Sequence, residues 1–125
     1  MKFIIAGHGK YPYGVLHTLN LLAGNRDDIF CISEQMDNNG FQKEIDELLE
    51  RFKNEETVVF TDILEGAVNQ YFTRRLRDYD FHLITGFNLA LILELMFKDN
   101  IEEEELEEII ESSREQLIYI SDLLR

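Results

Sequence analysis

Four short apolar runs are spaced along the chain, and each has the length of a single strand. They lie at residues 2–7, 29–33, 57–61 and 81–85. The first contains Phe3, Ile4, Ile5 and Ala6 and ends at a glycine. Runs that are apolar throughout, rather than alternating with polar residues, are typical of strands covered on both faces in a parallel sheet. The pattern therefore predicts a sheet of parallel strands.

Between and after these runs, apolar residues recur at the spacing of a helix face. Pro12 suits the first turn of the first helix and Gly24 suits its end. Asn88 is expected to cap a helix over about 89–97, and a turn is expected at 37–40. Besides the helix at 89–97, four helices are predicted. Their apolar faces consist of Val15, Leu16, Leu19 and Leu22; Phe41, Ile45, Leu48, Leu49 and Phe52; Val68, Tyr71, Phe72 and Leu76; and Leu106, Ile109, Ile110 and Leu117.

Strands that alternate with helices predict an α/β fold. We expect a doubly wound, mostly parallel four-stranded sheet of order 2-1-3-4, with helices on both faces and right-handed crossovers. The length of 125 residues suits one hydrophobic core, so a single domain is expected over residues 1–125.

The charge and cysteine content narrow the class of protein. A net charge of −13 disfavours nucleic acids and anionic membranes as partners, because both are negatively charged. The single cysteine, Cys31, lies in an apolar run and is expected to be a buried structural thiol. The start of the chain lacks the pattern of a signal peptide, and no apolar stretch is long enough for a membrane span. We therefore expect a cytoplasmic protein.

Candidate chemistry is sought at the carboxyl ends of the predicted strands, where open parallel sheets bind their ligands. The residues at this edge are Gly7-His8-Gly9, Ser33-Glu34, Asp62, and Gly86 with Asn88. His8 lies between two glycines, so little side-chain cover surrounds its ring. Asp62, at the end of another strand, is placed to accept the Nδ1 proton and leave Nε2 as the nucleophile. The pair predicts an active histidine oriented by a carboxylate.

Each member of this pair also has a structural interpretation, because a loop histidine often caps a carbonyl and a strand-end aspartate often caps the next helix. Together, at the predicted active edge, the two favour the functional interpretation. His17 and His82 fall within a helix and a strand, so surface or structural roles are expected for them. No metal site is predicted, because scattered histidines without cysteines form no ligand pattern. No nucleotide-binding glycine motif occurs either.

Three segments of the chain resemble one known family. Residues 4–9 read IIAGHG and are followed by GVL at 14–16, residues 58–68 read VVFTDILEGAV, and residues 84–89 read ITGFNL. They are similar to the strand–histidine turn, the threonine–aspartate turn and the glycine–asparagine turn of the enzyme IIA component of the mannose/fructose/sorbose family. This family belongs to the bacterial phosphoenolpyruvate-dependent sugar phosphotransferase system.

The resemblance implies that the protein is a phosphocarrier. His8 would accept a phosphoryl group from phospho-HPr and pass it to a IIB component, while Asp62 holds the histidine from behind. Gly9, Gly66 and Ala67 would line the phosphate pocket. The resemblance further implies that no cofactor is needed and that the protein is a homodimer. Contact with the membrane components IIC and IID would occur only through IIB.

Two other functions remain open at this point. The phosphotransfer subunit of dihydroxyacetone kinase carries a similar domain, although the end of this chain at Arg125 favours a sugar-transport IIA. A regulatory module that binds partners without efficient transfer is the other alternative. It is suggested by Glu65, Ala67 and Val68, which replace a glycine, a serine and a proline of the family's turn, and by Ala90, which replaces a second proline.

Overall fold

A computed structural model of the chain describes residues 1–35 and 40–125. The structure forms two compact units, Met1–Phe87 and Asn88–Arg125. In the first unit the elements are β1 (Lys2–His8), α1 (Tyr11–Ala23), β2 (Ile29–Glu34), α2 (Gly40–Arg51), β3 (Thr57–Thr61), α3 (Ala67–Arg75) and β4 (His82–Thr85). In the second they are α4 (Leu89–Leu95), α5 (Glu103–Arg114) and α6 (Ile120–Leu123).

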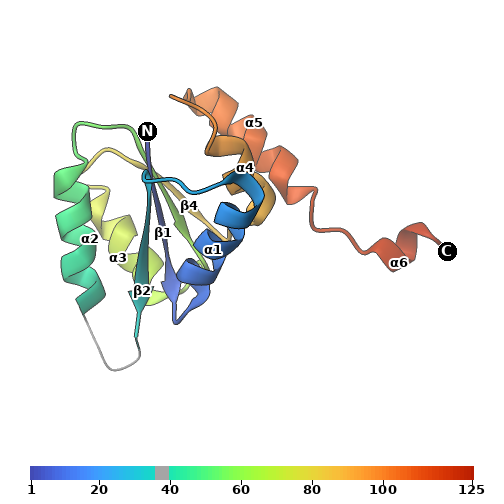
Figure 1. The fold of residues 1–125 in the computed structure, drawn as a ribbon, viewed down its shortest axis with the longest axis horizontal. Helices are drawn as coiled ribbons and strands as arrows, with labels where there is room; N and C mark the ends of the chain where they lie inside the picture. Colours follow the sequence, from blue (N-terminus) through green and yellow to red (C-terminus); the bar gives the residue numbers. More distant parts are fainter. Residues whose placement is uncertain (36–39) are drawn as a thin grey trace. The chain divides into compact units, whose positions relative to one another are not determined.

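The sheet of the first unit has the predicted topology (Figure 1). Its four strands are parallel and lie in the order β2-β1-β3-β4. The expected α/β fold is therefore confirmed. Each strand ends within a residue or two of the expected position, and all four carboxyl ends meet at one edge.

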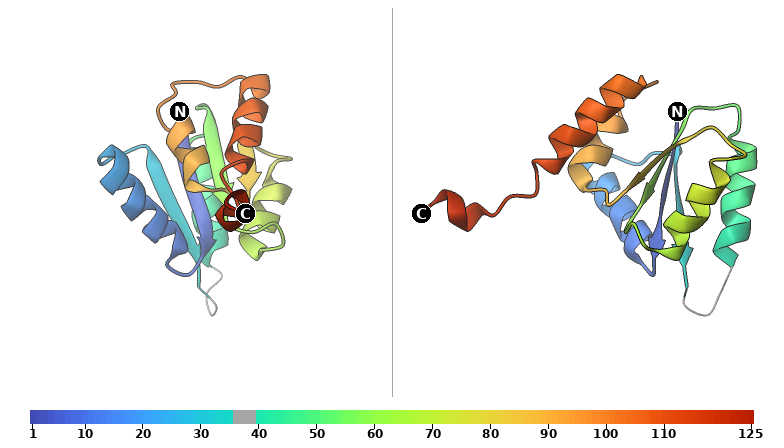
Figure 2. Two further views of the ribbon diagram at one scale, coloured as in Figure 1. Left: turned by 90° about the vertical axis from the view of Figure 1, so that its right-hand side faces the viewer. Right: turned by 180° about the vertical axis from the view of Figure 1, so that it is seen from behind.

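Helices cover both faces of this sheet, as Figures 1 and 2 show for α1 on one side and α2 with α3 on the other. Ile4 and Ala6 belong to a buried cluster together with residues of α2 and α3 such as Ile45 and Phe72. Because successive side chains of a strand alternate between faces, Phe3 and Ile5 point toward the opposite face, which α1 covers. Phe3, Ile4, Ile5 and Ala6 are thus buried under helices on one face of the sheet or the other, which explains the unbroken hydrophobic pattern of β1.

The first helix begins and ends at the expected residues, but two of the predicted apolar face positions are exposed. Pro12 lies in the first turn of α1, and Gly24, with φ +84°, ends that helix. Leu22 is exposed and does not belong to the buried face of α1, and Leu76 is likewise exposed at the end of α3. The expected turn at 37–40 falls largely on residues 36–39, which lie outside the described part of the chain.

The second unit is built from α4 and α5, which pack against each other. Asn88 caps α4 as expected, because its Oδ1 accepts a hydrogen bond from the Leu91 N–H at 2.9 Å. No helix in the described residues is long and apolar enough to cross a membrane.

The expected last helix is too long, because α5 ends at Arg114 and Leu117 is 92% exposed. The position that continues the buried face after Ile109 is Ser113, whose hydroxyl bonds back to the Ile110 carbonyl at 2.8 Å. The next amides, of Gln116 and Leu117, bond three residues back in the tighter 3₁₀ manner. With no apolar residue to bury at this point, packing does not extend the helix.

Candidate functional site

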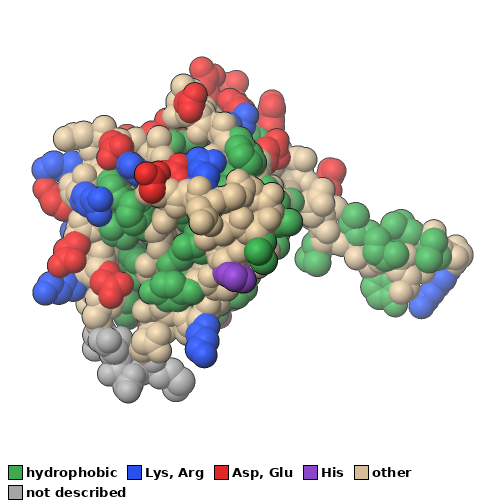
Figure 3. Space-filling view, viewed as in Figure 1, with side chains coloured by type: hydrophobic (Ala, Val, Ile, Leu, Met, Phe, Trp, Pro, Cys, Tyr) green, Lys and Arg blue, Asp and Glu red, His purple; other side chains and the backbone are tan. Residues whose placement is uncertain are grey.

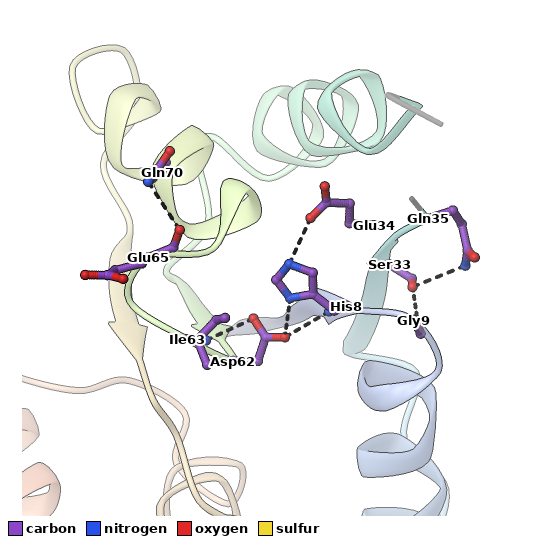
Figure 4. Close-up of polar contacts among 9 residues, drawn as sticks. All are labelled: His8, Gly9, Ser33, Glu34, Gln35, Asp62, Ile63, Glu65 and Gln70. Atoms are coloured by element: carbon purple, nitrogen blue, oxygen red, sulfur yellow. Dashed lines mark hydrogen bonds and ion pairs between the residues drawn. The ribbon is translucent and has the colours of Figure 1, made fainter. Parts of the chain in front are cut away.

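His8 and Asp62 lie together at the carboxyl edge of the sheet (Figure 4). His8 is the last residue of β1, and Asp62 directly follows β3, the strand paired with β1 on one side. The Nδ1 atom of His8 lies 2.7 Å from Oδ2 of Asp62. The same Oδ2 atom accepts a hydrogen bond from the His8 backbone N–H at 2.9 Å. Asp62 therefore fixes both the ring and the main chain of His8.

The Asp62 carboxylate is itself held in place. Its Oδ1 atom accepts a hydrogen bond from the Ile63 backbone N–H at 2.9 Å, and its side chain is only 11% exposed. The His8 side chain, in contrast, is 44% exposed. An aspartate that accepts a proton from Nδ1 selects the tautomer in which Nε2 carries the lone pair. The arrangement thus presents an accessible, oriented imidazole.

Residues 62–66 form the turn that joins β3 to α3 and brings Gly66 against the histidine ring. A β-carbon at Gly66 would lie 2.9 Å from Cε1 of His8, so only glycine allows this approach. Gly66 is also the N-cap of α3, and no side chain caps that helix. Ala67 is the first helical residue and is exposed. The uncapped N-terminus of α3 therefore lies beside the ring, where its amides favour an anion.

Gly9 is also close to His8, but its amide is already bonded. The Gly9 N–H donates to the backbone carbonyl of Glu34 at 3.1 Å. The Ser33 hydroxyl donates to the Gly9 carbonyl and in turn accepts from the Gln35 side-chain amide at 3.4 Å. Gly9 thus fastens the segment after β1 to the end of β2.

Glu34 contacts the other side of the His8 ring. Its Oε2 atom lies 3.0 Å from Nε2, so each ring nitrogen faces a carboxylate, as Figure 4 shows. The sequence places Glu34 at the active edge, but its pattern does not predict this contact. The signal is the strand register, in which Glu34 of β2 pairs with His8 of β1.

These carboxylates change the protonation of His8. The hydrogen bond that the His8 ring donates to Asp62 is the largest influence and raises the pKa of His8 above its ordinary value of 6.5. Partial burial lowers this pKa, while the negative charges of Asp62 and Glu34 raise it further. The net effect is an upward shift, so the doubly protonated imidazolium persists to higher pH than in a free histidine.

The other histidines lie elsewhere. His17 is exposed on α1, and His82, on β4, lies 3.3 Å from Glu56 through its Nε2 atom. Within residues 1–35 and 40–125, no three His, Cys, Asp or Glu side chains are grouped as metal ligands. Of the three histidines, His8 is the one that lies at the carboxyl edge of the sheet, as an oriented imidazole beside a helix N-terminus.

Comparisons with solved structures reveal relatives that share this fold. A phosphoenolpyruvate-dependent sugar phosphotransferase system (PTS) permease, described as putative, from Klebsiella pneumoniae is 30% identical, with a TM-score of 0.86 over 99% of this chain and 93% of that one. A PTS IIA protein associated with the fucose utilization operon of Streptococcus pneumoniae is 24% identical, with a TM-score of 0.86 over 99% and 96%. A mannose/sorbose-specific IIA subunit from Enterococcus faecalis is 18% identical, with a TM-score of 0.76 over 94% and 92%.

Sequence comparison identifies the family. None of the curated proteins compared with the chain matches it. The family model described as PTS system fructose IIA component matches residues 2–114, which include His8, Glu34 and Asp62. The chain therefore belongs to the PTS fructose IIA component family and is a IIA-type domain of the sugar phosphotransferase system.

Proposed function

We propose that the protein is a phosphocarrier that accepts a phosphoryl group from phospho-HPr on Nε2 of His8 and passes it to a IIB component during sugar uptake. The observation that carries this proposal is the 2.7 Å contact between Nδ1 of His8 and Oδ2 of Asp62, on a ring that is 44% exposed. A partner protein can reach such a ring, and membership of the IIA family supplies the context.

The transfer needs few groups from the protein. The N–P bond of the donor phosphohistidine breaks as the Nε2–P bond forms, and the donor ring keeps the electron pair of the broken bond. The Asp62 carboxylate holds the Nδ1 proton throughout and stabilises the positive charge that the ring gains. Amides at the start of α3, from Ala67 onward, lie beside the ring to donate to phosphoryl oxygens. Asp62 then remains bonded as the group moves on to the acceptor.

The test is phosphoryl transfer from labelled phosphoenolpyruvate through enzyme I and HPr. We expect acid-labile label on the wild-type protein and none on His8→Ala. His17→Ala, which removes an exposed histidine from α1, is the matched control and should label normally. Asp62→Ala should label more slowly, by a factor on the order of 100, because the ring loses its orienting carboxylate.

Failure of the wild-type protein to label, with HPr itself charged, would overturn the proposal and favour a binding module. Addition of a IIB component should then discharge the labelled protein. If only a dihydroxyacetone kinase system accepted the group, the IIB assignment would be wrong while the phosphocarrier role stood.

We further propose that residues 1–125 act as one IIA domain in the cytoplasm and that the protein is a homodimer. The family match at 2–114 spans both structural units. The dimer is supported by the apolar segment 117–124, where Figure 3 shows hydrophobic side chains gathered near the end of the chain. Its exposed apolar residues are Leu117, Ile118, Tyr119, Ile120, Leu123 and Leu124.

Light scattering after gel filtration tests the dimer. The expected mass is twice the 14.8 kDa of one chain, and Leu117→Lys with Ile120→Lys should shift it toward one chain. A single-chain mass for the wild-type protein at high concentration would contradict the dimer without affecting the phosphocarrier proposal.

A further inference from the structure

The sheet register brings Glu34 to the reactive side of His8. β1 and β2 are parallel, with Glu34 directly paired to His8 as the last residue of each strand. The backbone carbonyl of Glu34 also accepts the Gly9 N–H at 3.1 Å, which fastens the two strand ends to each other. The Glu34 side chain therefore starts from a fixed point beside the ring.

The contact with His8 is the main interaction that offsets the cost of burying an oxygen of the Glu34 carboxylate. Its Oε2 atom is buried, lies 3.0 Å from Nε2 of His8 and makes no hydrogen bond to any described residue. The side chain as a whole is 22% exposed. A buried carboxylate oxygen without a hydrogen-bond donor is destabilising unless a positive charge lies nearby. A doubly protonated His8 supplies that charge.

The surroundings of His8 contain no competing cation among the described contacts. Asp62 approaches from the segment after β3 and Glu34 from β2, and these are the charged groups that face the ring. Glu65, on the 62–66 turn, is exposed and directed away from His8 in Figure 4. Lys10, at the start of α1, is also exposed. In the resting state the ring therefore lies between two carboxylates.

This arrangement places Glu34 where the phosphoryl group must arrive. Asp62 holds Nδ1, which leaves Nε2 as the only ring nitrogen that can be phosphorylated. An oxygen 3.0 Å from Nε2 occupies the approach to that nitrogen. When the ring is protonated at both nitrogens, Nε2 also has no lone pair to attack phosphorus.

We propose that Glu34 is a further residue of the transfer site, a carboxylate that closes Nε2 at rest, withdraws before the phosphoryl group arrives, and then repels that group toward the next acceptor. This inference rests on the proposed function. As transfer begins, the Glu34 carboxylate moves aside and the Nε2 proton is lost to water. The freed lone pair then forms the N–P bond. The phosphoryl group and the carboxylate are both negative, so their proximity disfavours the phosphorylated state.

The first test needs no partner protein. The ring of His8 is titrated by NMR in the wild-type protein, in Glu34→Gln and in Glu65→Gln. We expect the midpoint to fall in Glu34→Gln and to stay unchanged in Glu65→Gln, the control that removes a nearby carboxylate without a contact to the ring. Equal midpoints in all three proteins would overturn the inference.

The second test measures phosphorylation with phosphoramidate, a small molecule that phosphorylates histidine without a protein donor. At about pH 6, we expect Glu34→Gln to be labelled several-fold faster than the wild-type protein, and the ratio should decrease as the pH rises and the ring loses its second proton in both proteins. Glu34→Asp keeps the charge but shortens its reach, so it should also be labelled faster than wild type. This variant keeps the test informative if Glu34→Gln folds poorly.

The two tests separate this inference from the phosphocarrier proposal. If HPr fails to label the protein but Glu34→Gln still reacts faster with phosphoramidate, the phosphocarrier role is lost and the closure of Nε2 by Glu34 stands. If HPr labels the protein while phosphoramidate reacts equally with wild type, Glu34→Gln and Glu34→Asp at every pH, the role stands and the inference is wrong.

Discussion

The Asp62 carboxylate fills the space that a side chain at Gly7 would need. A β-carbon at position 7 would lie 2.7 Å from both Cγ and Oδ2 of Asp62. The glycine before His8 is therefore required by the carboxylate that holds the ring, because no side chain fits between β1 and Asp62. The requirement is one of space.

Gly7→Ala should displace Asp62 and weaken its hold on His8. We expect slower phosphorylation of His8 and a His8 titration midpoint closer to 6.5, measured by NMR. Gly14→Ala is the control, because a β-carbon there meets nothing within 4 Å and alanine favours the helix by about 0.5–1 kcal/mol. A wild-type midpoint in Gly7→Ala would show that Asp62 adapts to the added methyl group.

Asn69 should stabilise the 62–66 turn. Its Oδ1 accepts from the Thr61 hydroxyl at 2.7 Å in a buried setting, and its amide donates to the part-buried Leu64 carbonyl at 3.0 Å. Asn69→Ala leaves the buried Thr61 hydroxyl and the part-buried Leu64 carbonyl without these partners, so we expect a loss of about 1–3 kcal/mol in the free energy of unfolding by urea. Gln70→Ala, which removes an exposed side chain, should be nearly neutral; equal losses in the two variants would exclude a special role for Asn69.

The stability of the protein should depend on pH through His8. Because the folded pKa of His8 lies above the unfolded value near 6.5, the folded state binds the proton more tightly. The stability that this protonation contributes is fully present below pH 6.5 and is lost as the pH rises through the pKa of His8 in the folded state. Urea unfolding at a series of pH values should therefore show a steeper decline for wild type than for Asp62→Asn in this window. If the stability of the two proteins depended on pH in the same way, Asp62 would not be the group that raises the pKa of His8.

Cys31 should be unreactive in the folded protein. Burial raises the pKa of its thiol to about 11, and its Sγ–H donates weakly to the Pro12 carbonyl at 3.4 Å. We expect alkylation by iodoacetamide near pH 8 to be slow in buffer and fast in urea, as followed by mass spectrometry. Equally fast labelling in both conditions would show that β2 opens readily.

The sheet and the His8–Asp62 pair could be predicted because they depend on local patterns. Apolar runs locate the strands, and the rule that ligands bind at the carboxyl edge then brings together residues that follow different strands. The contact of Glu34 could not be predicted in this way, since it depends on the register of β1 with β2 and on the side-chain conformation. A shift of one residue would have sent Glu34 to the other face.

The end of the last helix shows a different limit. Spacing alone includes Leu117 in the apolar stripe, but the inward position before it is Ser113, and α5 ends at Arg114. Periodicity predicts where a helix face lies more reliably than where packing stops supporting it. The turn at 62–66 was likewise visible in the sequence, but the bonds of Asn69 that hold it were not.

β1 precedes both of its sheet neighbours in the chain, although it lies between them in the fold. During synthesis His8 leaves the ribosome long before Glu34 and Asp62. Glu34 reaches the ring only when β2 pairs with β1, and Asp62 reaches it only when β3 pairs with β1. The orientation of His8 by Asp62 is therefore acquired only after β3 has been made, and a chain truncated before Asp62 would leave the imidazole without its orienting carboxylate.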